Sequence, residues 1–422
     1  MAAVEGAEQG VSLDGARQAA FDPDGLRCAF GLLEGWVAEG ILPGAAVLVA
    51  RGGRIAGEAY LGLAHTEQRR PVDAGTIWSL ASITKPFTAT AVMLLVEEGY
   101  LSLDEPLYRY IPEFMRAPET PFDRRTVTLR HTLAHCSGLP GFSEDNLALR
   151  QAHRPLADFV RSFGRQALLF APGTAHLYSN PGILMAAEAA ARALDGTLGR
   201  ELEEPSIARF HPFVQHSILT RLGMEHTSLL PPAEWDGRIA WVERTGQEGL
   251  DWEAANSAYY RSLGIPWGGM FSTPRELVRF VDLFLPAAGG RLRVGARAGD
   301  GQRLVSPATA RLMTSVQYAP PDAPADLAPE LRDAAARTPP LPAVEWGIGW
   351  EVKGTKRPHR SGELTSAGTF AHAGATGTMV WADPHTDVVC VLLTNRTLVS
   401  GWTTERPRQA LFSNAVMAAV QA

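Results

Sequence analysis

A serine and a lysine three residues apart form the first candidate site in this 422-residue sequence. Ser82 and Lys85 lie in SLASITKPFTATAVMLLVEEG, and residues at this spacing share one face of a helix. A serine hydroxyl becomes a good nucleophile when a neighbouring group removes its proton, which a lysine can do once burial and nearby positive charge make it neutral. The sequence uses three lysines among its 39 Lys and Arg residues, and arginine keeps its proton. The pair therefore predicts a nucleophile and its base, although such a spacing also arises by chance.

A tyrosine and an asparagine form the second candidate group, in the segment APGTAHLYSNPG. Tyr178 and Asn180 are two residues apart in an extended or turn segment, so we expect their side chains on one side. A phenol near an ammonium group can ionise or relay a proton, and a carboxamide can contact both a lysine and a substrate carbonyl. Taken alone, the segment is more typical of an ordinary loop.

The third group lies in GTFAHAGATGTMVW, which has the pattern of a strand and a turn. On a strand, His372 and Gly374 face the same side. A glycine lets a substrate approach the backbone closely, and the next N–H, that of Ala375, can polarise a carbonyl group. A strand histidine beside small residues is by itself more often structural.

In this order the three groups resemble the three motifs of the serine β-lactamase-like superfamily. The matching segments are Ser82-Ile-Thr-Lys85, Tyr178-Ser-Asn180 and His372-Ala-Gly374. The likeness is greatest to class C β-lactamases and family VIII carboxylesterases, which are related to DD-peptidases. It covers nearly the whole sequence, including LPGAAVLVARGGRIAGEAYLG, VTLRHTLAHCSGLPG, PWGGMFSTPRELVRF and EWGIGWEV.

The resemblance implies a role for each residue of the site. Ser82 would be the nucleophile, Lys85 and Tyr178 would handle its proton, and Asn180 would contact the substrate and the lysine. The N–H groups of Ser82 and Ala375 would form the oxyanion hole. The implied chemistry is acyl transfer through an acyl-enzyme, with no cofactor and with a small ester or amide as substrate.

The third motif departs from the family pattern, because class C β-lactamases usually have lysine where this sequence has His372. A neutral imidazole offers no permanent charge to a substrate carboxylate. We therefore expect an esterase acting on small carboxylic esters. A β-lactamase or D-amino-acid peptidase is the alternative, and a non-catalytic binding protein on the same fold is a further one. Lys353-Gly354-Thr355 looks like a scrambled third motif, but it lies in the polar KGTKRPHR stretch and we interpret it as a hairpin tip outside the site.

The elements that must position these residues predict an α+β fold. Residues 45–50 and 54–60 flank two glycines and read as a hairpin, and further short β-rich runs follow from 345 to 395. A last helical stretch runs from about 406 to 420. We expect an antiparallel sheet flanked by N- and C-terminal helices, of the β-lactamase/transpeptidase-like type, with a mostly helical lobe inserted.

This interpretation divides the chain into a discontinuous sheet lobe, residues 1–78 and 260–422, and a helical lobe, residues 79–259. The helix that carries Lys85 is expected to end at Gly99. Another helix is predicted where Thr273 and Glu276 suit the N-cap and N3 positions of a capping box.

Composition narrows the classes of function. The net charge of −6 and the lack of a basic stretch argue against nucleic-acid binding. No apolar run approaches the ~18 residues of a membrane span, and the first residues lack a secretory pattern, so we expect a cytoplasmic protein without membrane contact. The oligomeric state is not predicted. Three widely separated cysteines, Cys28, Cys136 and Cys390, are interpreted as buried thiols.

Two further features remain outside the motifs. His131 and His135 are four residues apart and could face a metal from one helix, but no third ligand is apparent, so we interpret both as structural. Residues 318–344 are rich in Pro and Ala and are expected to form a long surface loop.

Overall fold

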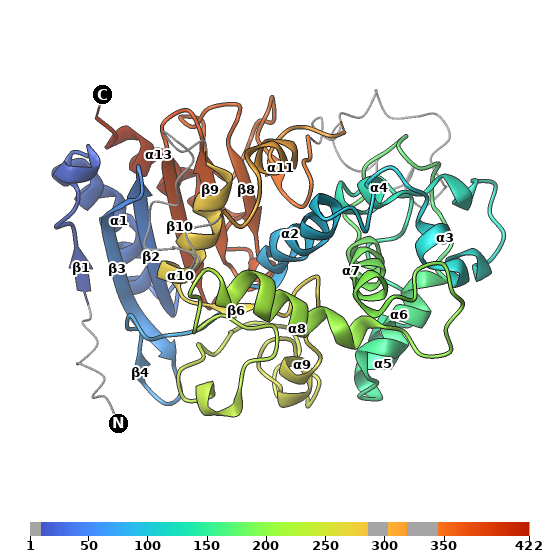
Figure 1. Ribbon diagram of the computed structural model, residues 1–422. Coiled ribbons are helices and arrows are strands. Elements are labelled where there is room, and N and C mark those ends of the chain that lie inside the picture. Colours follow the sequence, from blue (N-terminus) through green and yellow to red (C-terminus); the bar gives the residue numbers. More distant parts are fainter. Residues whose placement is uncertain (1–9, 286–302, 319–344, 422) are drawn as a thin grey trace.

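The main sheet is antiparallel and is built from both ends of the chain (Figure 1). A computed structural model describes residues 10–285, 303–318 and 345–421. Its eight-stranded sheet has the order β1-β3-β2-β10-β9-β8-β7, and β4 pairs with β3. The strands are β1 (Gly10–Ser12), β2 (Gly44–Arg51), β3 (Arg54–His65), β4 (Arg70–Pro71), β7 (Glu351–Val352), β8 (Phe370–Ala373), β9 (Met379–Asp383) and β10 (Val388–Thr394). The predicted fold class is confirmed.

The hairpin of β2 and β3 forms where the sequence predicts it. Arg51 pairs with Arg54, and the two residues between them, Gly52 and Gly53, have φ of 58° and 72°. A two-residue turn with positive φ at both positions matches the right-handed twist of the strands, and glycine adopts it without steric cost.

Helices cover both faces of the sheet, so its central strands are apolar on both sides. Cys390 and Leu392 of β10 pack toward two terminal helices, whereas Val391 and Leu393 belong to the core on the opposite face. The successive residues of a strand point to opposite faces, and burial of both explains the unbroken run VVCVLL. The terminal helices are α1 (Pro23–Ala38) and α13 (Arg408–Ala418). The opposite face contacts α10 (Pro274–Val281), and α2 (Thr84–Glu97) packs against α10.

Most of the remaining helices come after β5 (Trp78–Ser79) and before β6 (Phe271–Ser272) in the sequence, and these two strands pair with each other. The helices are α3 (Leu107–Tyr110), α4 (Leu129–Leu133), α5 (Asn146–Gln151), α6 (Leu156–Gly164), α7 (Asn180–Asp195), α8 (Phe210–Val214) and α9 (Ala258–Ser262), and α11 (Pro307–Met313) follows later in the chain. Helices α3 to α7 gather away from the sheet, on the right of Figure 1, and α8 and α9 lie below the middle of the picture. The division into two lobes and the boundaries of those lobes remain a prediction.

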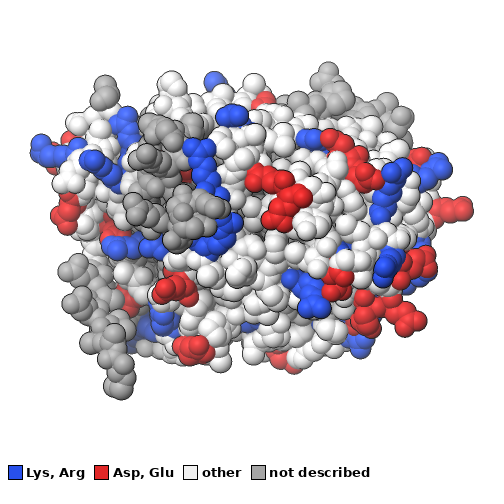
Figure 2. Space-filling model, viewed as in Figure 1, with Lys and Arg blue, Asp and Glu red and all other residues white. Residues whose placement is uncertain are grey.

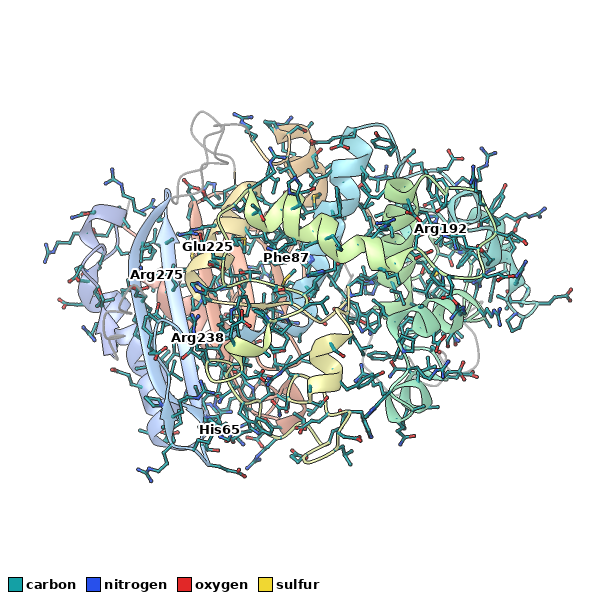
Figure 3. All side chains as sticks on the ribbon, turned by 60° about the horizontal axis from the view of Figure 1, so that its bottom comes forward. His65, Phe87, Arg192, Glu225, Arg238 and Arg275 are labelled. Carbon is teal, nitrogen blue, oxygen red and sulfur yellow. The ribbon has the colours of Figure 1, made fainter. Side chains whose placement is uncertain are left out.

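Helix α2 joins the sheet side to the helical side. It packs against α7, and twelve consecutive residues from Thr84 to Leu95 are buried. A helix enclosed on every side is mostly apolar, and the buried polar side chains of α2, such as Lys85, Thr88 and Thr90, form hydrogen bonds. Phe87 stacks on Phe280 of α10 with ring centroids 3.6 Å apart and lies near the middle of Figure 3. The helix ends as predicted, with Gly99 at φ 79° just beyond it.

Three details differ from the sequence interpretation. Thr273 caps α10 as expected, but the Glu276 carboxylate accepts from the His226 N–H and the Thr227 hydroxyl instead of completing a capping box. Cys28 is exposed, whereas Cys136 and Cys390 are buried as predicted. Of the expected surface loop at 318–344, residues 319–344 lie outside the described part of the chain.

The visible surface carries charges of both signs. On the face drawn in Figure 2, Lys and Arg are interspersed with Asp and Glu, and wide areas carry neither. This mixture agrees with the small net charge of −6. Across the described residues, the longest apolar helices fall short of what a membrane crossing requires.

Candidate active site

The structure brings Ser82 and Lys85 into contact. Ser82 lies in a 3₁₀ turn (Ala81–Ile83) that leads directly into α2, and Lys85 follows in the first turn of that helix. Lys85 Nζ lies 3.0 Å from Ser82 Oγ and donates to the backbone carbonyl of Trp267 at 2.8 Å. A hydroxyl and an amine at this distance can exchange a proton.

Burial favours the neutral form of Lys85. Its side chain is fully enclosed, and this burial holds its pKa well below the ordinary value because a charged ammonium loses its hydration there. The sequence interpretation also called for neighbouring positive charge, but burial by itself accounts for the lowered pKa of Lys85. A neutral amine can donate to the Trp267 carbonyl while its lone pair accepts the proton of Ser82.

The nucleophile turn is held in an unusual backbone conformation. Ala81 has φ 46°, in the left-handed region that non-glycine residues rarely adopt. The Thr84 hydroxyl donates to Ala81 O at 2.6 Å and accepts from Met270 N–H at 2.9 Å. Strain of this kind persists where the surroundings fix the chain, often at functional sites. The sequence gives no signal for it.

Tyr178 completes the contact around the nucleophile. Lys85 Nζ lies 4.5 Å from the centre of its ring, and its hydroxyl interacts with the Ser82 side chain. Burial raises the pKa of Tyr178, and the interaction with Ser82 offsets only part of this effect. The phenol is therefore protonated at neutral pH and is suited to donate or relay a proton.

Asn180 is the first residue of α7, a helix start that the sequence interpretation did not identify. The signal was present, because Ser179 is a good N-cap and Pro181 suits the first turn. The Asn180 side chain donates to Gly141 O at 3.0 Å, and its backbone N–H donates to the same oxygen at 3.1 Å. The hydrogen bonds of Lys85 go instead to Ser82 and Trp267.

His372 reaches the site from β8 as a neutral imidazole. Its Nδ1 lies 3.0 Å from Ala373 O, and its ring centroid is 6.2 Å from that of Tyr178. Burial first, and then the nearby Lys85, lower the pKa of His372 to about 3. This places no permanent positive charge at the position where class C β-lactamases usually have lysine.

Position 374 requires glycine because the backbone there packs closely against Leu80, in the segment before Ser82. A Cβ atom at this position would lie 2.2 Å from Leu80 O and 2.2 Å from Thr378 Oγ1. The close approach predicted here is thus with the chain itself, since the turn docks on the residues before Ser82. Ala375, at the tip of this turn, is exposed, and its N–H has no hydrogen-bond partner within the described ranges.

Aromatic residues around the site were not singled out from the sequence. Trp346 lies in EWGIGWEV, which was interpreted only as a connecting segment. Its ring centroid is 5.7 Å from that of Tyr178 and 5.8 Å from that of His372. The sequence did show a tryptophan next to a turn, but this pattern is too common to indicate a functional site.

Two sequence features stay outside the site or take another role. Lys353 donates to Thr365 O at 2.6 Å within the connection between β7 and β8 and is buried. Helix α4 ends at Leu133, and His135 has φ 57°, so His131 and His135 do not share a helix face. In the part of the chain that is described, no group of three or more His, Cys, Asp or Glu is placed to hold a metal ion.

Comparison with known proteins identifies the family. The family model described as Beta-lactamase matches residues 31–412, so the chain belongs to the Beta-lactamase family. Its fold is that of the β-lactamase/transpeptidase-like proteins, and the resemblance noted in the motifs is confirmed.

The individual relatives are described as different kinds of protein. An uncharacterized protein of Mycobacterium tuberculosis is 28% identical over 84% of this chain and 86% of its own. Esterase EstB of Burkholderia gladioli is 39% identical, over 33% of this chain and 38% of its own. A penicillin-binding protein homolog from Caulobacter crescentus has the same fold, with a TM-score of 0.69, 22% identity and coverage of 94% of this chain and 98% of its own.

Proposed function

We propose that the protein is a serine hydrolase that cleaves small, uncharged carboxylic esters through an acyl-enzyme on Ser82. The observation that carries the proposal is the 3.0 Å contact between Ser82 Oγ and the buried Lys85 Nζ, whose pKa lies well below its ordinary value. Membership of the Beta-lactamase family and the partial likeness to an esterase are consistent with it.

Acylation begins when Ser82 Oγ attacks the ester carbonyl carbon and its proton passes to Lys85 Nζ. The oxyanion lies between the N–H groups of Ser82 and Ala375, where fixed donors stabilise developing charge. When the C–O bond breaks, the proton returns from Lys85 through the Tyr178 hydroxyl to the departing alcohol. Water then attacks the acyl carbon, gives a proton to the same pair, and Ser82 leaves with that proton.

The preference for uncharged substrates follows from the neutral state of His372. The two basic residues whose charge acts on His372 are Lys85, whose own pKa is lowered by burial, and Arg360, whose Nε lies 3.3 Å from the Glu351 carboxylate. A charge-assisted hydrogen bond contributes about 1.5–3 kcal/mol. Without one, the site favours neutral esters over carboxylate-bearing β-lactams and peptides that end in D-Ala.

The nucleophile is tested with a serine-directed fluorophosphonate and intact-mass measurement. We expect one adduct on wild type and none on Ser82→Ala, whose turnover should fall by about 10⁶-fold while its circular dichroism is unchanged. An adduct of equal stoichiometry on the alanine variant would refute the assignment. A wild type that neither labels nor turns over any ester would indicate a non-catalytic binding protein.

The substrate class is tested by comparing kcat/KM for p-nitrophenyl butyrate, nitrocefin and a D-Ala-D-Ala peptide. Wild type should prefer the ester, and His372→Lys should gain on the two anionic substrates by roughly 10- to 150-fold. If wild type instead prefers nitrocefin or the peptide, the protein is a β-lactamase or a D-amino-acid peptidase.

A further inference from the structure

One residue, His135, holds the backbone on both sides of Tyr178. The N–H of Leu177 donates to the backbone carbonyl of His135 at 2.9 Å, and the N–H of Ser179 donates to its Nδ1 at 3.1 Å. The imidazole ring also lies against the tyrosine, with centroids 4.4 Å apart and an interplanar angle of 35°. The position of the phenol therefore depends on His135 through three separate contacts.

The same residue fixes the start of the helix that follows. Ser179, held by His135, caps α7 by accepting from Gly182 N–H at 3.1 Å, and its hydroxyl donates to Pro140 O at 2.8 Å. On its other side, the His135 ring meets Trp346 edge-on at 4.8 Å. Tyr178 thus cannot move without disturbing the helix start or this aromatic contact.

The hydrogen bond from Ser179 also fixes the protonation of His135. Because Nδ1 accepts, it carries no proton, and the neutral ring has its proton on Nε2. Burial and the nearby His176 and Lys85 lower its pKa well below the ordinary value, which agrees with this neutral tautomer. The ring accordingly adds no positive charge beside Lys85.

We propose that His135 is a positioning residue for Tyr178, which it holds in place for proton transfer to the leaving alcohol. The inference rests on the proposed esterase function and goes beyond it, because the sequence interpretation treated His135 as structural. Its effect falls on one step, the protonation of the leaving group. Ester substrates with different leaving groups can isolate that step.

Two substitutions of His135 by side chains of equal size distinguish a role in positioning Tyr178 from a general role in stabilising the fold. In His135→Asn, the side-chain oxygen can take the place of Nδ1 as acceptor, and asparagine tolerates the left-handed backbone at this position. In His135→Leu, the side chain has the same number of heavy atoms as asparagine and no acceptor. His131→Leu is the matched control: His131 Nδ1 also accepts a backbone N–H, that of Thr128, but no hydrogen bond or ring contact joins His131 to Tyr178 among the described residues.

The assay compares kcat/KM for p-nitrophenyl butyrate and ethyl butyrate, which share an acyl group. p-Nitrophenolate leaves without protonation, whereas ethoxide needs a proton. We expect His135→Leu to lose about 10- to 100-fold on the ethyl ester, as a misplaced group does, and much less on the p-nitrophenyl ester. His135→Asn should recover most of the ethyl ester activity, and His131→Leu should leave the ratio of the two activities at its wild-type value.

The outcomes distinguish this inference from the proposed function. If wild type hydrolyses both esters and Tyr178→Phe changes their ratio, but His135→Leu lowers both activities equally, His135 only supports the fold and the inference is wrong. The same holds if His135→Asn loses as much as His135→Leu. If wild type hydrolyses neither ester, the proposed function itself fails.

Discussion

Replacing Lys85 by methionine should change how the free energy of unfolding depends on pH. Methionine has a similar length and no charge, so Lys85→Met removes a proton-binding group without leaving a large cavity. In the folded protein the Lys85 pKa lies well below its ordinary value because the amine is buried, whereas in the unfolded chain it is about 10.4. Between these two pKa values the unfolded wild type binds more protons than the folded one, so its stability rises with pH.

The magnitude follows from linkage. Each pH unit inside that window adds about 1.4 kcal/mol to the unfolding free energy of wild type relative to Lys85→Met. Below the folded pKa both states are protonated, the difference is constant, and wild type carries the whole cost of burying a charge. Above about pH 10.4 the amine is neutral in both states and that cost is gone.

Urea unfolding of both proteins at steps from about pH 6 to about pH 10 measures this difference, and the other titrating groups largely cancel. The pH at which the difference begins to rise should coincide with the acid limb of wild-type kcat/KM, because both report the Lys85 pKa of the free enzyme. Parallel stability curves would show that Lys85 is not held neutral by burial, and the proposed base would then be wrong.

Two further substitutions test the packing that supports the site. Gly374→Ala should cost about 1–3 kcal/mol of unfolding free energy and lower kcat/KM, because the new Cβ has no room. The control is Gly31→Ala in α1, where no atom lies within 4 Å of the new Cβ, and it should stabilise the protein by about 0.5–1 kcal/mol. Equal effects of the two substitutions in urea unfolding would contradict this reasoning. Arg192→Leu should cost about 3–5 kcal/mol of unfolding free energy, because the buried Glu188 carboxylate, which lies 2.6 Å from Nε of Arg192 (Figure 3), loses its charged partner. The control is Arg109→Leu at an exposed ion pair, which should cost under about 1 kcal/mol in the same measurement.

The sequence predicted the parts of the fold that depend on local pattern. The β2–β3 hairpin follows from two adjacent glycines between apolar runs, and the Ser82–Lys85 contact follows from helical spacing. Features that depend on tertiary packing were missed or misassigned. The close neighbour of Gly374 is Leu80, almost 300 residues earlier in the chain, and no local pattern reports that distance.

The contacts of His135 show why residue type alone was insufficient to predict its proposed role. Its Nδ1 contacts Ser179 and its ring contacts Trp346, residues far from it in sequence. From the sequence, His135 stood out only by its spacing from His131, and we interpreted both residues as structural because no third metal ligand was apparent. The helix stops before His135, and the ring instead turns toward the segment that carries Tyr178.

The buried groups around the nucleophile constrain one another through charge. Lys85 contributes to lowering the pKa of both His135 and His372, and each of the three is enclosed away from water. Because like charges repel strongly where water is excluded, a proton on one of them opposes protonation of the other two. Because burial keeps both imidazoles neutral, they exert no such repulsion on the amine, and burial is what lowers the pKa of Lys85. The same enclosure that costs folding free energy at Lys85 therefore favours a neutral amine, which the proposed mechanism uses as its base and which a solvent-exposed lysine could not provide at neutral pH.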